Sequence, residues 1–260
     1  MRKAIRVITG NNSELEPKCL TELSDVDAND FLQEMSILKD DEIVPAIRSK
    51  LRHNILTMPK EILQASGIMI FGRKIRSLVF TTDLAIIKNC DADAVFAVYP
   101  FTPQQSISDA IIKAASIPVF VGVGGGITRG RRAVGLAVDA ECQGAYGVVL
   151  NTPTTNHDLR AVSQAVDIPV VITVTSEKTD LKNRLRHGAA IFNIAAGSRT
   201  PELVRIIDKQ FPDIPIIATG GNRPESIIET VAAGANAITY TPPSTKELFA
   251  ETMERYREQY

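Results

Sequence analysis

Two kinds of segment alternate along the second half of this 260-residue chain. In one kind, a turn residue and Ile-Pro precede an apolar run, as in SIPVFVGVGGG from Ser116, DIPVVITVTS from Asp167 and DIPIIATGGN from Asp213. In the other, Gly-Ala precedes the run, as in GAYGVVLNT, GAAIFNIAAG and GANAITYTPP. Proline is tolerated at the first position of a strand, and glycine fits the position just past a helix end. The alternation therefore predicts repeated pairs of strand and helix.

The apolar runs are continuous, as expected for parallel strands that are covered on both faces. Segments with helical periodicity lie between them, up to a final helix over 245–260. Eight strands follow from this pattern: 75–83, 91–100, 118–123, 146–151, 169–175, 191–195, 214–219 and 237–241. Eight parallel strand–helix units close into a barrel, so we predict an α/β fold, a (β/α)8 TIM barrel over residues 75–260. The alternative, a doubly wound open sheet, needs a reversal of strand order and usually has fewer strands.

Residues 1–74 lack this alternation and predict an N-terminal α+β extension. A strand is expected over 3–10, and helices over 27–35 and 41–52. The sequence GIMIFGRKIRSLVF favours a hairpin around Gly72 that leads into the first barrel strand. We expect the extension to cover the bottom of the barrel or a subunit interface.

The composition narrows the classes of partner. A formal net charge of -1 favours neither nucleic acid nor a membrane, and no apolar run reaches the ~20 residues of a membrane span. The three cysteines and three histidines are dispersed without metal-ligand spacing, which predicts a reduced, cytoplasmic protein and no metal site. We expect a homo-oligomer, most simply a dimer.

The carboxyl ends of the strands form the functional face of such barrels, and the residues there are small, polar and almost uncharged. Asp83 is the one carboxylate among them, and we predict it as the general base. The alternative is that Asp83 caps the short helix LAIIKN, since aspartate is favoured at that position. Asn151, Thr173 and Asn193 are predicted to orient the substrate.

Consecutive glycines end the strand IPIIATGGN and open the next helix, where free backbone N–H groups favour an anion. The predicted ligand- and phosphate-binding residues are Gly197, Ser198, Thr219, Gly220, Gly221, Asn222 and Ser244. The last strand continues into Thr241-Pro242-Pro243, where proline removes the N–H donors that a complete phosphate cup would use. The alternative is that the glycines only make a tight turn between strand and helix.

A second glycine-rich loop, GVGGGITRG, follows the strand over 118–123. It leaves room for a planar or bulky substrate, or it only makes space at the barrel mouth. The predicted lining of the substrate pocket is Tyr99, Gly124, Gly125, Gly126, Arg129 and Tyr240.

The segment IPIIATGGNRPESIIETVAAGANAI resembles the seventh-strand region of ribulose-phosphate-binding barrels, which include thiamin-phosphate synthases and barrels of histidine and tryptophan biosynthesis. It also resembles that region in flavin-dependent nitronate monooxygenase and IMP dehydrogenase barrels. Along the whole barrel the chain is more similar to an uncharacterised bacterial group with a generic hydrolase label, a label these residues do not support.

The anion site and the single carboxylate together predict an enzyme that acts on a small phosphorylated metabolite by isomerase- or lyase-type acid–base chemistry. No cofactor is predicted for this function. The alternatives are an oxidoreductase that binds FMN through the same glycines, and a non-catalytic sensor or scaffold that binds a phosphate ligand.

Overall fold

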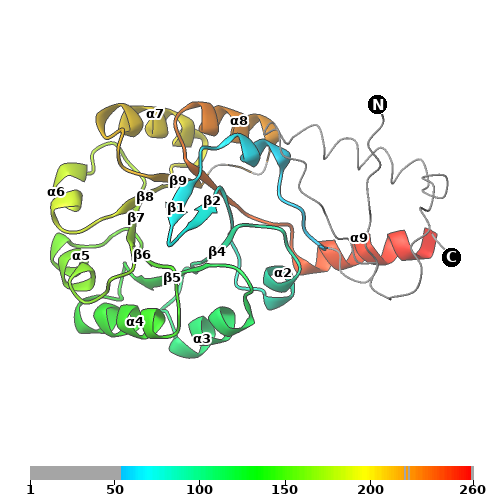
Figure 1. Cartoon of the computed structure of the whole chain (residues 1–260), viewed down its shortest axis with the longest axis horizontal. Coiled ribbons are helices and arrows are strands. Elements are labelled where there is room, and N and C mark those ends of the chain that lie inside the picture. Colours follow the sequence, from blue (N-terminus) through cyan, green and yellow to red (C-terminus); the bar gives the residue numbers. More distant parts are fainter. Residues whose placement is uncertain (1–53, 220, 222, 259–260) are drawn as a thin grey trace, which may run out of the picture. The chain divides into compact units, whose positions relative to one another are not determined.

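The computed structural model describes residues 54–219, 221 and 223–258, and the elements expected before residue 54 lie outside this part. Eight parallel strands close into a barrel, which confirms the predicted fold (Figure 1). Neighbouring strands follow one another in sequence, and β10 pairs with β3 to complete the ring. The strands are β3 Ser77–Val79, β4 Ala94–Ala97, β5 Val119–Gly124, β6 Gly147–Leu150, β7 Val170–Val174, β8 Ile191–Ile194, β9 Ile216–Thr219 and β10 Ala237–Tyr240.

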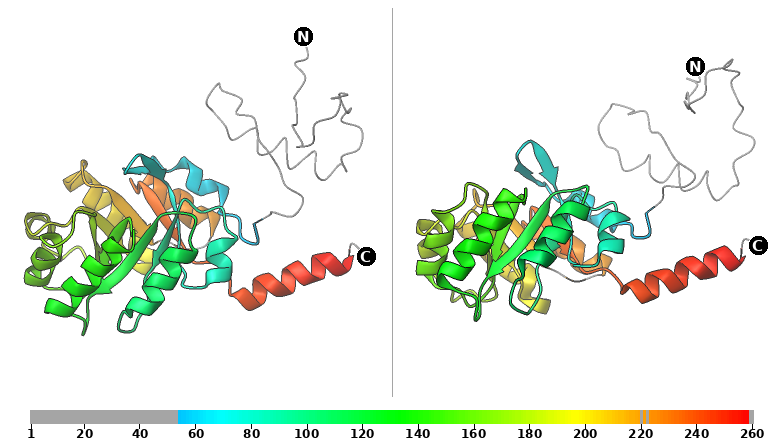
Figure 2. Two further views of the ribbon diagram at one scale, coloured as in Figure 1. Left: turned by 60° about the horizontal axis from the view of Figure 1, so that its bottom comes forward. Right: turned by 90° about the horizontal axis from the view of Figure 1, so that it is seen from below.

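A helix follows each barrel strand, as the sequence pattern predicts. The helices are α2 Leu84–Lys88, α3 Gln105–Ala114, α4 Gly130–Cys142, α5 Asn156–Ser163, α6 Leu181–Arg186, α7 Thr200–Gln210, α8 Pro224–Ala232 and α9 Thr245–Glu258, with the 3-10 turn η3 Gly197–Arg199 before α7. Most of them surround the barrel, whereas α9 extends away from it (Figure 2). None of the described helices has the length and apolar character of a membrane span.

Each strand buries two faces, which explains its continuous apolar sequence. On the inside, residues such as Phe120, Val171 and Ile217 form the barrel core. On the outside, residues such as Ile172 and Ala218 pack with the helices. Two-sided burial of this kind allows alternate residues of one strand to serve the barrel interior and the helix layer.

A hairpin closes the amino-terminal end of the barrel. Its strands are β1 Ile68–Ile70 and β2 Arg73–Ile75, and their buried isoleucines join the inner core. Before it, the 3-10 turn η2 Lys60–Gln64 packs on α8. The side chain of Asn236 donates to the Ser66 hydroxyl at 2.9 Å and accepts the Ile216 N–H at 2.7 Å, which ties this segment to the sheet.

The compact unit consequently runs from Asn54 to Tyr260 and includes residues that the sequence assigned to the extension. Because the hairpin covers one end of the barrel, the carboxyl-terminal mouth is the end that is left for a ligand.

Phe120→Ala should lower the free energy of unfolding by about 3–5 kcal/mol, because the ring is fully buried in the barrel core and its loss leaves a cavity. Gly147 has no side chain at this point, and a Cβ there would lie 2.7 Å from the Phe120 ring. Urea unfolding measures the effect. The control is Ile228→Ala on α8, where the side chain is 44% exposed and the change should cost only about 0.5 kcal/mol.

Candidate functional site

A row of hydrogen-bonded polar side chains lines the inside of the barrel near its mouth. Thr219 Oγ1 donates to Asn193 Oδ1 at 3.0 Å, and Asn193 Nδ2 donates to Thr173 Oγ1 at 3.3 Å. Thr173 Oγ1 in turn donates to Asn151 Oδ1 at 2.9 Å. We call Asn151, Thr173, Asn193 and Thr219 the polar row; it joins the carboxyl ends of four adjacent strands, β6 to β9.

All the hydrogen bonds of the polar row run in one direction, from Thr219 toward Asn151. The row therefore ends on the Asn151 Nδ2 group, which has no hydrogen-bond partner among the residues that the structure describes. Hydrogen bonds in such a chain polarise one another, so this terminal amide is a strengthened donor. A ligand oxygen at the mouth is the partner that this donor can take.

The polar character continues onto a fifth strand. Thr239 on β10 is 2% exposed, and its register partner on β9 is Thr219. Its hydroxyl is buried without a hydrogen-bond partner in the described part of the chain. A buried polar group without a partner costs free energy, so this half of the barrel interior is more polar than folding alone requires.

The opposite half of the mouth is apolar. Phe80, Phe96 and Val98 belong to the inner core, and the Phe80 and Phe96 rings lie 6.2 Å apart between centroids. The mouth thus offers amides and hydroxyls on one side and aromatic carbon on the other. This arrangement suits a small ligand with one polar and one apolar edge.

Asp83 is the N-cap of α2. Its Oδ1 accepts the N–H groups of Ala85 at 2.8 Å and Ile86 at 3.3 Å, and its Oδ2 accepts the Thr245 hydroxyl. The hydrogen bond from Thr245 is the largest cause that lowers the pKa of the Asp83 carboxyl. The carboxylate therefore joins the starts of α2 and α9 and is ionised at neutral pH. Its role as a general base stays a prediction.

Ser244 belongs to a capping box at the start of α9. The Glu247 N–H donates to Ser244 Oγ at 3.3 Å, and Glu247 Oε2 accepts the Ser244 backbone N–H and hydroxyl, each at 2.7 Å. This reciprocal pair satisfies the helix terminus. The serine that was predicted as a phosphate ligand already has a structural partner.

The loops predicted to bind phosphate lie at the ends of β8 and β9. Gly197 and Ser198 are exposed in η3, and Gly221 is exposed with φ +49°. Thr200 was missed by the sequence analysis: its hydroxyl accepts the Ala196 N–H at 3.0 Å and donates to the Thr219 carbonyl at 3.3 Å. Thr200 thereby ties the loop after β8 to the end of β9. Gly220 and Asn222 lie outside the described residues.

The second glycine-rich loop packs against the backbone at the end of β6. A Cβ on Gly125 would lie 2.3 Å from the Asn151 carbonyl oxygen, and one on Gly124 would lie 2.9 Å from Leu150. The Asn151 N–H donates to the Gly124 carbonyl at 2.9 Å. Gly126 has φ +61°, and its carbonyl accepts Arg129 Nε at 2.6 Å. These glycines hold Asn151 in position, and their contact with substrate stays a prediction.

The two tyrosines that were predicted to line the substrate pocket lie in different environments. The Tyr99 hydroxyl accepts the Gln104 N–H at 3.1 Å, and its ring packs on Phe101 at 4.4 Å. Tyr240 belongs to the outer cluster between strands and helices, so it points away from the barrel interior. Burial raises the pKa of the Tyr240 hydroxyl.

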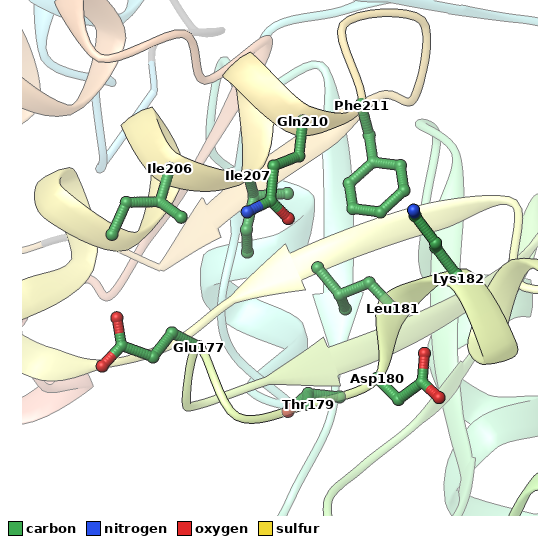
Figure 3. Close-up of a pocket in the computed structure, with 9 residues that line it drawn as sticks. All are labelled: Glu177, Thr179, Asp180, Leu181, Lys182, Ile206, Ile207, Gln210 and Phe211. Carbon is green, nitrogen blue, oxygen red and sulfur yellow. The ribbon is translucent and has the colours of Figure 1, made fainter.

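Two cavities lie near the loops of the carboxyl-terminal face. One, of about 420 Å³, lies between the loops after β6 and β7 and includes Thr152, Lys178 and Arg184 in its lining. The other, of about 370 Å³, lies between the loop after β7 and α7, and Figure 3 shows Lys182 and Phe211 at its edge. Lys178 and Arg184 were not predicted, because no sequence motif marks a cation in a loop and another on the following helix as one site.

No family model matches the sequence, and no curated protein matches it. Solved structures do match the fold. One is described as a phosphonomutase of Burkholderia cenocepacia J2315, with 17% identity, TM-score 0.54, and coverage of 71% of this chain and 93% of that one. A second is a 2,3-dimethylmalate lyase described as a PEP mutase/isocitrate lyase superfamily member, with 14% identity, TM-score 0.54, and coverage of 70% and 81%.

A third structure is phosphonopyruvate hydrolase in complex with oxalate and Mg²⁺, with 14% identity, TM-score 0.53, and coverage of 76% and 87%. At these identities the likeness establishes the barrel fold. Phosphate binding, and the ribulose-phosphate-binding type of barrel in particular, stay predictions.

The described residues do not fit a divalent metal such as the Mg²⁺ of that hydrolase complex. In the described ranges, no group of three or more His, Cys, Asp or Glu side chains is placed to hold a metal ion. The polar row offers amides and hydroxyls, and both oxygens of Asp83 already accept hydrogen bonds. Since Mg²⁺ usually takes carboxylate ligands, we derive no step through a metal.

Asp83→Ala should lower the free energy of unfolding by about 1 kcal/mol at neutral pH, whereas Asp83→Asn should cost less because asparagine also caps helices. The folded-state pKa lies below the ordinary value of 3.8, so the stabilisation is present above that value and is lost as the pH falls through the folded-state pKa. Urea unfolding from pH 7 down to about pH 3 measures this. A gap between wild type and Asp83→Ala that stays constant below pH 4 would contradict the capping interpretation.

Proposed function

We propose that this chain binds a small phosphorylated or carboxylate metabolite at the carboxyl-terminal mouth of the barrel. The observation that carries the proposal is the polar row, which ends on the unpartnered Nδ2 group of Asn151. Two N–H donors at this point match an anionic oxygen, and the apolar half of the mouth matches a carbon skeleton.

We further propose that the chain is an enzyme of the isomerase or lyase class. The proposal is supported by enzymes of the same fold whose names refer to small carboxylates or phosphonates. Among them are the dimethylmalate lyase and the phosphonopyruvate hydrolase in complex with oxalate. Preorganised amide donors stabilise an oxyanion that develops during such reactions. Asp83 is the proposed base: its lowered pKa keeps it in the basic form, and Oδ2 has a second lone pair besides the one that accepts the Thr245 hydroxyl.

The second candidate is a non-catalytic sensor of a phosphate ligand. It is favoured by the composition of the polar row, whose four members carry no ionisable group. FMN as a cofactor, the homodimer and the cytoplasmic location stay predictions. α9 exposes Phe249 and Met253, which a second copy would cover in a dimer.

Asn151→Asp should weaken binding of the anionic ligand by about 10-fold or more. Aspartate still accepts the Thr173 hydroxyl but replaces the two N–H donors with negative charge. A thermal-shift screen of sugar phosphates, phosphonates and dicarboxylates identifies a ligand, and calorimetry measures its Kd. Asn54→Asp, an exposed site before η2, makes the same charge change as a control. Equal affinity of wild type and Asn151→Asp for the identified ligand would refute the site, and flavin absorbance of the purified protein would redirect the function to an oxidoreductase.

Asp83→Asn separates enzyme from sensor once a substrate is known. Asparagine keeps the cap but cannot take a proton, so a catalytic base predicts a loss of kcat on the order of 100-fold with little change in Tm. Steady-state kinetics and thermal unfolding give the two quantities. Undiminished turnover in this variant leaves Asp83 with its capping role alone.

A further inference from the structure

We propose that the 420 Å³ cavity between the loops after β6 and β7 binds the doubly charged end of the ligand, a phosphate or dicarboxylate group, with Lys178 and Arg184 as its cations. The inference rests on the proposed anionic ligand and assigns it a second binding region. This cavity is on the opposite side of β8 from the glycine-rich loop after β9, where the sequence predicted the anion.

Both cations of the cavity are available to a ligand. Neither Lys178 nor Arg184 lies within 4.0 Å of a carboxylate in the described part of the chain. Arg184 is half-buried, and one of its five N–H donors has a partner, Asn156 Oδ1 at 2.9 Å. That contact orients the guanidinium and leaves its other edge for a planar pair of oxygens.

The remaining groups of the cavity are consistent with an anion. Asp180 is the one carboxylate in the lining, and its Oδ1 accepts the Asn183 N–H at 3.1 Å as the cap of α6. Burial lowers the pKa of the Arg184 guanidinium, and the charge of Asp180 acts in the opposite direction. A half-buried arginine with few partners gains from an oxyanion that replaces the lost water. The Thr175 and Ser176 hydroxyls add donors.

The cavity adjoins the polar row. Thr152, which lines the cavity, follows Asn151 directly, and its hydroxyl donates to the Thr173 carbonyl at 2.6 Å. None of the four residues of the polar row lines the cavity itself, so a ligand that also meets the Asn151 amide has to extend from the cavity past Thr152 into the barrel mouth. The cavity is an open depression of about 420 Å³, so a charged group can enter it directly from solvent.

The alternative anion site offers a less available cation. Arg199, beside Ser198 in η3, is 3.2 Å from Glu202 and 3.8 Å from Glu177. Its charge is therefore partly neutralised by carboxylates, in contrast to Lys178 and Arg184.

The test is the affinity of the full-length protein for inorganic phosphate and, in a separate titration, for oxalate at constant ionic strength. Lys178→Gln and Arg184→Gln should each weaken binding of the preferred ion by about 10-fold or more, since a hydrogen bond between charged groups is lost. Lys182→Gln is the matched control. This substitution removes the same charge at the start of α6, but Lys182 lines the neighbouring cavity (Figure 3). The affinity should therefore change less than twofold.

Arg184→Lys distinguishes loss of binding from misfolding. Lysine keeps the charge but lacks the planar guanidinium, so this variant should bind with intermediate affinity and have an unchanged Tm. Phosphate affinity that is insensitive to Lys178→Gln and Arg184→Gln but lost in Gly221→Val overturns this inference and leaves the proposed function intact. Loss of metabolite binding in Asn151→Asp without any effect of the two cation variants has the same meaning. Equal losses of affinity in Lys178→Gln and Lys182→Gln would mean that the effect comes from net charge alone, which also overturns the inference.

Discussion

Closure of the parallel sheet is the constraint on which the rest of this structure depends. Once β10 pairs with β3, every strand must bury one face in the barrel and the other under helices. The hairpin of β1 and β2 adds its isoleucines to the inner core and covers the amino-terminal end. The polar side chains inside the barrel consequently collect at the other end, where the strands finish.

At that end, the packing of a glycine-rich loop and the hydrogen bonds of the polar row converge on one residue. Gly124 and Gly125 approach the Asn151 backbone so closely that side chains there would collide with its surroundings. The Thr173 hydroxyl donates to Oδ1 of the Asn151 side chain, which leaves the Nδ2 group as the free end of the polar row. A structural requirement of the fold thus positions the donor that we propose to meet the ligand.

Several polar groups that the sequence marked as functional candidates form hydrogen bonds at helix termini. Asp83 caps α2 and Ser244 caps α9, and the Thr245 hydroxyl connects the two helix starts. Such groups satisfy backbone N–H donors that have no partner within the helix. The proposed function therefore relies more on the amides of the polar row and on the cations beside it than on a carboxylate at the mouth.

The sequence by itself determined the architecture. Ile-Pro and Gly-Ala in alternation predicted six of the barrel strands, and apolar runs predicted the first two. The hairpin at Gly72 and the possible cap at Asp83 also followed from local chemistry. Only the tertiary structure decided which polar residues act together. The Asp83–Thr245 and Ser66–Asn236 contacts join residues 162 and 170 positions apart, and the polar row joins side chains from four strands. Local patterns report backbone preferences over a few residues, whereas such contacts exist only after the barrel has closed.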